Sequence, residues 1–176
     1  MSPDQAHDLY RQELAVLEAE GQTGSATRDV NSLFYGRPHD DYVRALRSVR
    51  DEVEERAYLA IVAATEGVLQ TDFRARKRAK AKAKLRSSAK ALLKREKMKG
   101  RRVELEEILD AWCDEPGVPS GVIGEFKQLV AHRHWLAHGR YFIDKAGVPA
   151  DPGFAYARAR ALITQLQAID AAFPRS

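Results

Sequence analysis

Hydrophobic residues recur every three or four positions along most of the chain, which is the spacing of one face of an α-helix. The longest such pattern begins at about Asp40, and no proline interrupts it before Pro116. Its part from Ala57 to Leu69 is more apolar all round than the rest. A helix that is apolar on every side is normally buried. We therefore expect this segment to be the central helix of a bundle.

Shorter amphipathic segments lie on both sides of this central helix. Near the N-terminus, Ser2 is a suitable N-cap and Pro3 fits the first helical position, so a helix is expected from residue 1 to 20. Three more helices are expected at 103–113, from 120 to about 139, and from about 153 to 173. Segments rich in glycine, proline or small polar residues separate the helices, at 22–38, 114–119 and 141–152.

The absence of β-type alternation and of internal repeats predicts an all-α fold, an orthogonal or up-down helical bundle of five to seven helices. With 176 residues, 44% of them hydrophobic, the chain is expected to form one domain over 1–176. No apolar run reaches the roughly 18 residues of a membrane span, and no secretory signal pattern precedes the first helix. The single cysteine excludes an internal disulfide. We expect a cytoplasmic protein with no membrane partner.

Positive charge is concentrated in one segment, residues 74–102, which has a predicted helical break around 86–88. This basic segment holds 15 of the 29 Lys and Arg residues but one of the 25 acidic residues, so the rest of the chain carries a net charge of −10. Such a block repels itself and is neutralised most easily by a polyanion, which favours RNA or DNA as partner. A solvated helix that keeps the protein in solution is the alternative.

A second concentration of chemistry lies between Glu125 and Phe142, where three of the five histidines fall within seven residues, beside two arginines. Arginine carries a permanent charge and a planar set of donors suited to phosphate, and histidine exchanges protons near neutral pH. Together they indicate phosphate chemistry. On one helix, however, Arg133 and His138 point about 140° apart. They would meet only through the length of the arginine, a helix break or a second chain.

Two other interpretations of this cluster remain open. His134 and His138 have the four-residue spacing of paired helical zinc ligands, but the glutamate of an HExxH site is missing and Cys113 is distant in sequence. No metal or other cofactor is therefore assigned. Alternatively, Arg133 caps a helix C-terminus and the histidines are ordinary core or surface groups.

The central helix contains an acidic residue on its apolar stripe. Glu66 shares a face with Val62, Leu69 and Phe73, at offsets of four, three and seven. Burying an unpaired carboxylate is costly. Glu66 is therefore expected either to reach solvent at a cleft or to meet a cation.

The sequence RHWLAH, from Arg133 to His138, resembles the signature of the HEPN superfamily, in which an arginine precedes a histidine by four to six residues. The resemblance covers residues 40–173 and is nearest to the RiboL-PSP-HEPN type. It extends to the Gly-Arg-Tyr tail that follows the motif and to the acidic residue in an apolar second helix. The implied fold is a helical bundle, and the implied activity is that of a metal-independent endoribonuclease, in the setting of a toxin or defence protein.

The same resemblance implies roles for four residues. His138 would take the proton of a ribose 2′-hydroxyl, and Arg133 would stabilise charge on the phosphate under attack. His134 would orient the phosphate or the other histidine, and Glu66 would hold Arg133 in place. Independently of the resemblance, positive charge makes Lys80, Lys82, Lys84 and Arg86 of the basic segment, together with Arg140, the expected RNA-binding residues.

Partners and a second function follow from the same residues. The resemblance implies a homodimer in which two copies of the motif share one cleft, and Trp135 and Tyr141 are the expected apolar anchors. A non-catalytic nucleotide- or RNA-binding module is the alternative function. A further alternative is a toxin whose nucleotidyltransferase antitoxin silences it by modifying Tyr141.

Overall fold

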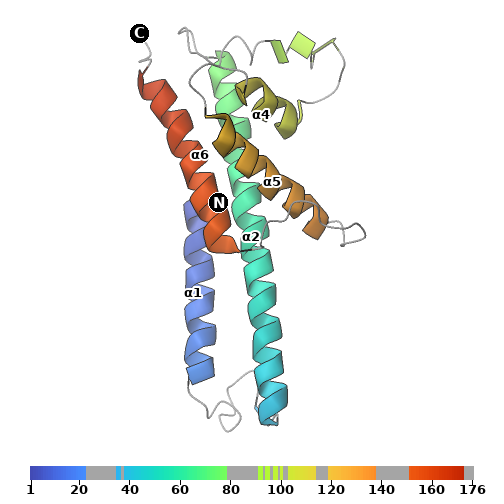
Figure 1. Ribbon diagram of the computed structural model, residues 1–176, viewed down its shortest axis with the longest axis vertical. Helices are drawn as coiled ribbons and strands as arrows, with labels where there is room; N and C mark the ends of the chain where they lie inside the picture. Colours follow the sequence, from blue (N-terminus) through green and yellow to red (C-terminus); the bar gives the residue numbers. More distant parts are fainter. Residues whose placement is uncertain are drawn as a thin grey trace.

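Figure 1 shows the computed structural model of the protein, which describes residues 1–22, 35–36, 38–78, 91–92, 94–95, 97–98, 100, 103–113, 119–137 and 151–172. Within these ranges the regular structure is helical, with no β-strand, which confirms the all-α prediction. The helices are α1 (Pro3–Gln22), α2 (His39–Arg78), α4 (Leu105–Cys113), α5 (Ser120–Ala137) and α6 (Pro152–Ala172). None of these described helices is both long and apolar enough to cross a membrane.

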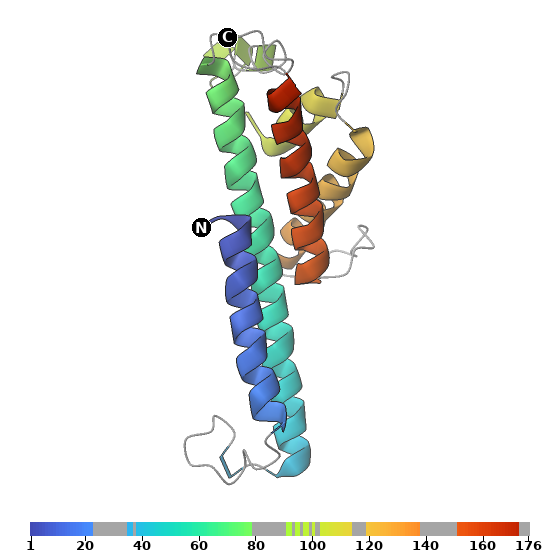
Figure 2. The same cartoon turned by 90° about the vertical axis from the view of Figure 1, so that its left-hand side faces the viewer.

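The other helices are arranged along α2, which runs through the molecule as one continuous rod (Figure 1). Its 40 residues extend about 60 Å at the α-helical rise per residue. Helix α1 packs antiparallel to the first half of α2 (Figure 2). Helix α6 packs along the second half, where α4 and α5 also pack. The molecule therefore has a two-helix hairpin at one end and a bundle at the other.

The main hydrophobic core lies in the bundle, around the second half of α2. The α2 residues Tyr58, Ile61, Val62, Leu69 and Phe73 are buried there, which confirms the prediction that this part of the helix is central. They pack against buried side chains of the surrounding helices, including Ile108, Leu109, Trp112, Ile123, Phe126, Leu129, Ala155, Ala159 and Leu162. The bundle end consequently holds most of the apolar contacts that fix the relative positions of the helices.

A capping box starts α1. The Ser2 hydroxyl oxygen accepts a hydrogen bond from the Gln5 backbone N–H at 3.2 Å, and the Gln5 side-chain oxygen accepts one from the Ser2 N–H at 2.8 Å. These bonds satisfy backbone donors that have no partner inside the helix. The predicted N-cap at Ser2 and first helical position at Pro3 are confirmed.

The start of α6 differs from the prediction by one residue. Pro152 was expected in an extended segment, but it is the first residue of α6. Proline fits this position because the first backbone N–H groups of a helix have no internal acceptor. The Asp151 carboxylate caps the helix by accepting a hydrogen bond from the Phe154 N–H at 2.5 Å. The Asp-Pro pair is therefore a helix start.

The N-terminal part of α6 rests on the N-terminal part of α1. The His7 and Tyr156 rings stack with their centroids 4.0 Å apart and their planes 1° from parallel. The Tyr156 hydroxyl donates a hydrogen bond to Asp4 Oδ1 at 2.7 Å. This bond stabilises the protonated phenol and raises the pKa of Tyr156. The contact joins two helices that are more than a hundred residues apart in sequence.

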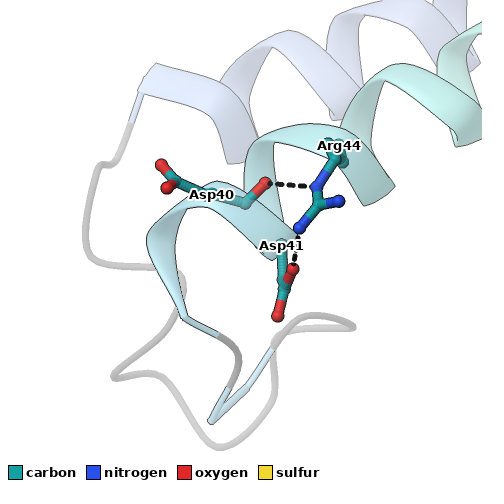
Figure 3. Close-up of polar contacts among 3 residues, drawn as sticks. All are labelled: Asp40, Asp41 and Arg44. Atoms are coloured by element: carbon teal, nitrogen blue, oxygen red, sulfur yellow. Dashed lines mark hydrogen bonds and ion pairs between the residues drawn. The ribbon is translucent and has the colours of Figure 1, made fainter.

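Polar contacts dominate the hairpin end, where the core is thin. Tyr42 is buried there among partly buried apolar residues of α2, and its hydroxyl donates to the Glu20 carbonyl oxygen at 2.8 Å. Figure 3 shows the first turn of α2, in which Arg44 donates to the Asp40 carbonyl oxygen at 3.4 Å and pairs with the Asp41 carboxylate. The Tyr42 bond joins the start of α2 to the end of α1, and the Arg44 bonds stabilise the first turns of α2.

Part of the basic segment can be located. Helix α2 continues into it as far as Arg78, and the residues described between 91 and 98 are helical. Gly100 has a φ of 63°, a left-handed conformation that favours glycine and is typical of the residue after a helix end. The predicted break at 86–88 lies outside the described residues.

Candidate functional site

Helix α5 carries the first five residues of the RHWLAH motif. Arg133 is half-buried in its last turns, and His134 is exposed. The predicted base His138 and the predicted RNA-binding residue Arg140 lie outside the described residues, as does Tyr141. The Arg133 and His134 positions are therefore the part of the motif from which the site can be built.

The side of α5 that packs into the core includes a histidine. His132 is 4% exposed, and its ring lies 5.3 Å from the Tyr58 ring in an edge-on contact and 5.3 Å from the Trp135 ring. It belongs to the core, as one interpretation of the histidine cluster proposed. Trp135, the expected dimer anchor, is half-buried beside it.

A hydrogen bond from α2 fixes the turn of α5 that precedes the motif. The buried Tyr58 hydroxyl donates to the Leu129 carbonyl oxygen at 3.0 Å. In an α-helix that carbonyl also accepts the N–H four residues later, which belongs to Arg133. The central helix thus holds the backbone turn from which the motif arginine projects.

Glu66 lies on the wall of a cavity between α2, α4 and α5. The cavity has a volume of about 750 Å³. It is lined by Ala63, Glu66, Gly67, Gln70, Thr71, Arg74, Val103, Glu104, Leu105, Glu106, Val130 and His134. Glu66 therefore reaches solvent at a cleft, which was one of its two expected environments. His134 shares that cleft with it.

The expected pair between Glu66 and Arg133 is not formed among the described residues. No hydrogen bond or ion pair engages the Glu66 carboxylate within that part of the chain, and Arg133 does not line the cavity. The helix period explains this result, because successive residues point about 100° apart. Val130 and His134, one turn apart on α5, face the cavity instead.

Carboxylates predominate on the cavity wall. The described lining residues include three glutamates, Glu66, Glu104 and Glu106, and one arginine, Arg74. Across the described residues, no three His, Cys, Asp or Glu side chains are grouped as metal ligands. The described part of the wall thus carries more carboxylate acceptors than cationic donors.

An ion pair joins the two helices that frame the cavity with α2. Lys127 of α5 donates to Asp110 Oδ1 of α4 at 2.7 Å, and this hydrogen bond raises the pKa of Lys127. Both side chains are solvent-exposed in part, so the pair contributes little to stability. The buried Ile108, Leu109 and Trp112 side chains, rather than this pair, hold α4 against the bundle.

Four of the predicted RNA-binding residues belong to the basic segment. Lys80, Lys82, Lys84 and Arg86 lie outside the described residues. Arg74, the first residue of the segment, lines the cavity, and α2 carries the chain directly from there into the segment. The motif and the start of the basic segment are therefore neighbours in space.

Sequence reasoning missed Gln70, Glu104 just before α4 and Glu106 in its first turn as site residues. Gln70 and Arg74 follow Glu66 by one and two helical turns, so the three polar side chains form a stripe on one face of α2. That stripe was detectable in the sequence. The glutamates at 104 and 106 were not, because they reach the cavity only through the packing of α4 on α2.

No family model, curated protein or solved structure matches the chain. The HEPN resemblance thus remains a prediction that rests on the motif residues and their surroundings.

Proposed function

We propose that the protein is a metal-independent RNA endonuclease of the HEPN type, acting in the cytoplasm as a toxin or defence protein. One observation carries the proposal. His134 from the motif, Glu66 from the central helix and Arg74 from the start of the basic segment line one open cavity. A histidine of the motif, the acidic residue of the central helix and the first cation of the basic segment are thereby neighbours.

The proposed reaction is an internal transesterification of RNA. His138 takes the proton from a ribose 2′-hydroxyl, and the oxygen attacks the adjacent phosphorus. The bond to the 5′-oxygen breaks, and that oxygen gains a proton from the solvent or a second histidine. The products carry a 2′,3′-cyclic phosphate and a 5′-hydroxyl. General base catalysis typically contributes about 10²–10⁴-fold.

Arg133 supplies charge in this mechanism. Its guanidinium binds two phosphoryl oxygens at once and stabilises the negative charge that develops on them during attack. The hydrogen bond from Tyr58 to the Leu129 carbonyl supports the backbone turn that presents it. His134, exposed at the cavity, orients the RNA next to the reacting phosphate.

Incubation of the pure protein with mixed RNA in excess EDTA tests the proposal. Cleavage should persist in EDTA and leave cyclic phosphate ends. Arg133→Ala and His138→Ala should abolish it, with helical content unchanged. Arg47→Ala, which removes an exposed arginine at the hairpin end, is the matched control and should cleave normally. Absence of cleavage by the wild type, or full activity of His138→Ala, would refute the proposed enzyme.

A non-catalytic RNA-binding module is the second candidate. It is favoured by the exposed cations of the basic segment, Arg74, Lys94, Arg95 and Lys97, which need no catalytic group to bind phosphate. In this case RNA binds with a steep dependence on salt and remains intact. A nucleotidyltransferase antitoxin that modifies Tyr141 would act on either version of the protein.

A further inference from the structure

The cavity beside the motif is large enough to enclose part of an RNA molecule. Its volume of about 750 Å³ lies within the range of ligand pockets. A second hollow of about 600 Å³ adjoins it along α2 and shares Ala63, Gly67 and Thr71 with it. These three residues, spaced by four, form a low ridge between the two hollows.

The ridge leaves room for a planar group above Gly67. A Cβ atom added at Gly67 would meet no heavy atom within 4 Å, so the space above this residue is open. The Thr71 hydroxyl donates to the Gly67 carbonyl oxygen at 2.8 Å, which engages it with the backbone. Val103, Leu105 and Val130 add apolar surface to the lining. A flat aromatic ring can therefore lie against this part of the cavity.

The polar part of the lining determines which ring fits. The Glu66 carboxylate is not engaged by another described residue, and the described lining holds Glu106 as a further carboxylate and Arg74 as its one guanidinium. A phosphate would be repelled by these charges, whereas a group that donates hydrogen bonds would be attracted. A carboxylate accepts two parallel N–H bonds through its two oxygens. The ligand should therefore present two neighbouring donors on one edge.

We propose that this cavity binds a guanine base of the RNA, with Glu66 accepting hydrogen bonds from guanine N1–H and N2–H. Guanine is the RNA base whose Watson–Crick edge carries these two adjacent donors, and proteins read single-stranded RNA through such edges. The inference rests on the proposed function, because it makes Glu66 the residue that selects the nucleotide held beside the reacting phosphate. Gln70, one turn later, lies on the same wall.

Calorimetric titration with single nucleotides tests the base site without any cleavage. Guanosine 5′-monophosphate (GMP) should bind at least about tenfold more tightly than the adenosine, cytidine and uridine monophosphates, as expected for a two-bond contact. Glu66→Gln keeps the size of the side chain but replaces one acceptor oxygen with a donor, so this preference should disappear. Equal binding of all four nucleotides by the wild type would refute the guanine site.

A second pair of variants tests the location. Gly67→Leu fills the open space above the ridge and should prevent GMP binding. Gly124→Leu is the matched control, because a Cβ at this exposed α5 position also meets nothing within 4 Å and lies outside the cavity. Leucine favours helix over glycine, so both variants should keep their helical content. Unchanged GMP binding by Gly67→Leu would place the nucleotide elsewhere and overturn the inference.

Cleavage in EDTA, measured on the same preparations, separates the two proposals. If RNA is cleaved but guanosine monophosphate binds no more tightly than the other nucleotides, the base site is refuted and the proposed enzyme stands. Selective binding of guanosine monophosphate without cleavage refutes the enzyme and supports the base site. Spermidine, used as a cationic probe, should not displace the nucleotide. If spermidine binds and guanosine monophosphate does not, the acidic wall serves a cationic ligand and the inference fails.

Discussion

Arg133 and His134 are neighbours in sequence but have different surroundings. His134 follows Val130 by one helical turn, and both line the cavity. Arg133 follows Leu129 by one turn, and the Leu129 side chain is fully buried. The arginine therefore leaves the helix from the edge of the core, and the histidine leaves it toward the cavity. In the proposed function, this divergence lets one residue contact phosphate while the other contacts the adjacent nucleoside.

The Tyr58 hydroxyl is expected to stabilise the fold measurably through its bond to the Leu129 carbonyl oxygen. Tyr58→Phe keeps the buried ring and removes that bond, so the free energy of unfolding should fall by about 1 kcal/mol. Urea denaturation followed by circular dichroism gives the value. The same loss should reduce RNA cleavage, because the turn that carries Arg133 becomes less restrained.

Tyr10→Phe is the matched control for this prediction. Tyr10 lies half-buried on α1, and burial raises its pKa. Its hydroxyl makes no hydrogen bond to another described residue, so the change to phenylalanine removes none there. Its replacement should change the unfolding free energy by less than about half as much. Equal losses in the two variants would show that the Leu129 bond contributes nothing specific.

At the scale of elements, local signals predicted the helices well. Ser2, Pro3 and the apolar stripe of α2 were sufficient to locate α1 and the central helix. The start of α6 was misplaced because Pro152 was treated as a helix breaker, although an aspartate precedes it. Helix periodicity also showed that Glu66 needed a cleft or a cation. The choice between them depends on the rotation of α5 about its axis, which a tertiary contact such as Tyr58 to Leu129 sets.

The cap of α6 should contribute to stability as a single residue. Asp151→Ala removes the acceptor for the Phe154 N–H, so the free energy of unfolding should fall by about 0.5–2 kcal/mol. Asp151→Asn retains a side-chain oxygen and should lose much less. Thermal and urea unfolding of the three proteins provide the comparison. If the alanine and asparagine variants were equally destabilised, lost charge would explain the effect better than a lost cap.

At the scale of the whole molecule, the basic segment carries the excess positive charge and the rest of the chain is net negative. The basic segment should dominate RNA affinity, with a log-log salt slope of about −0.7 for each phosphate contact on a single strand. Replacing Lys80, Lys82, Lys84 and Arg86 together with alanine should make the slope shallower. Fluorescence anisotropy of a labelled RNA at several salt concentrations measures it.

The control for this prediction removes the same number of positive charges from the hairpin end. The fourfold variant replaces Arg44, Arg47, Arg50 and Arg56, of which three form ion pairs with acidic neighbours. Its salt slope should match that of the wild type. A shallower slope here, with no change in the basic-segment variant, would identify the basic segment as a solvated helix.

The proposed catalytic pair predicts a homodimer. Arg133 and His138 point about 140° apart on an ideal helix, and a two-fold axis would bring two copies of each into one cleft. The half-buried Trp135 and Tyr141 are the expected anchors of the seam. Light scattering after size-exclusion chromatography should give twice the chain mass, and activity per chain should fall on dilution. A fully active monomer at micromolar concentration would exclude a shared site.

The continuity of α2 has a consequence for the way the molecule fluctuates. The bundle half of this helix is surrounded by three others, whereas its hairpin half has α1 as its main neighbour and few fully buried side chains. Segments with fewer buried contacts open at lower free energy, as separate cooperative units or foldons. One helix therefore belongs to two such units. Amides near Tyr42 should lose protection from hydrogen exchange while those near Tyr58 remain closed, and the wall of the cavity keeps its shape when the hairpin opens.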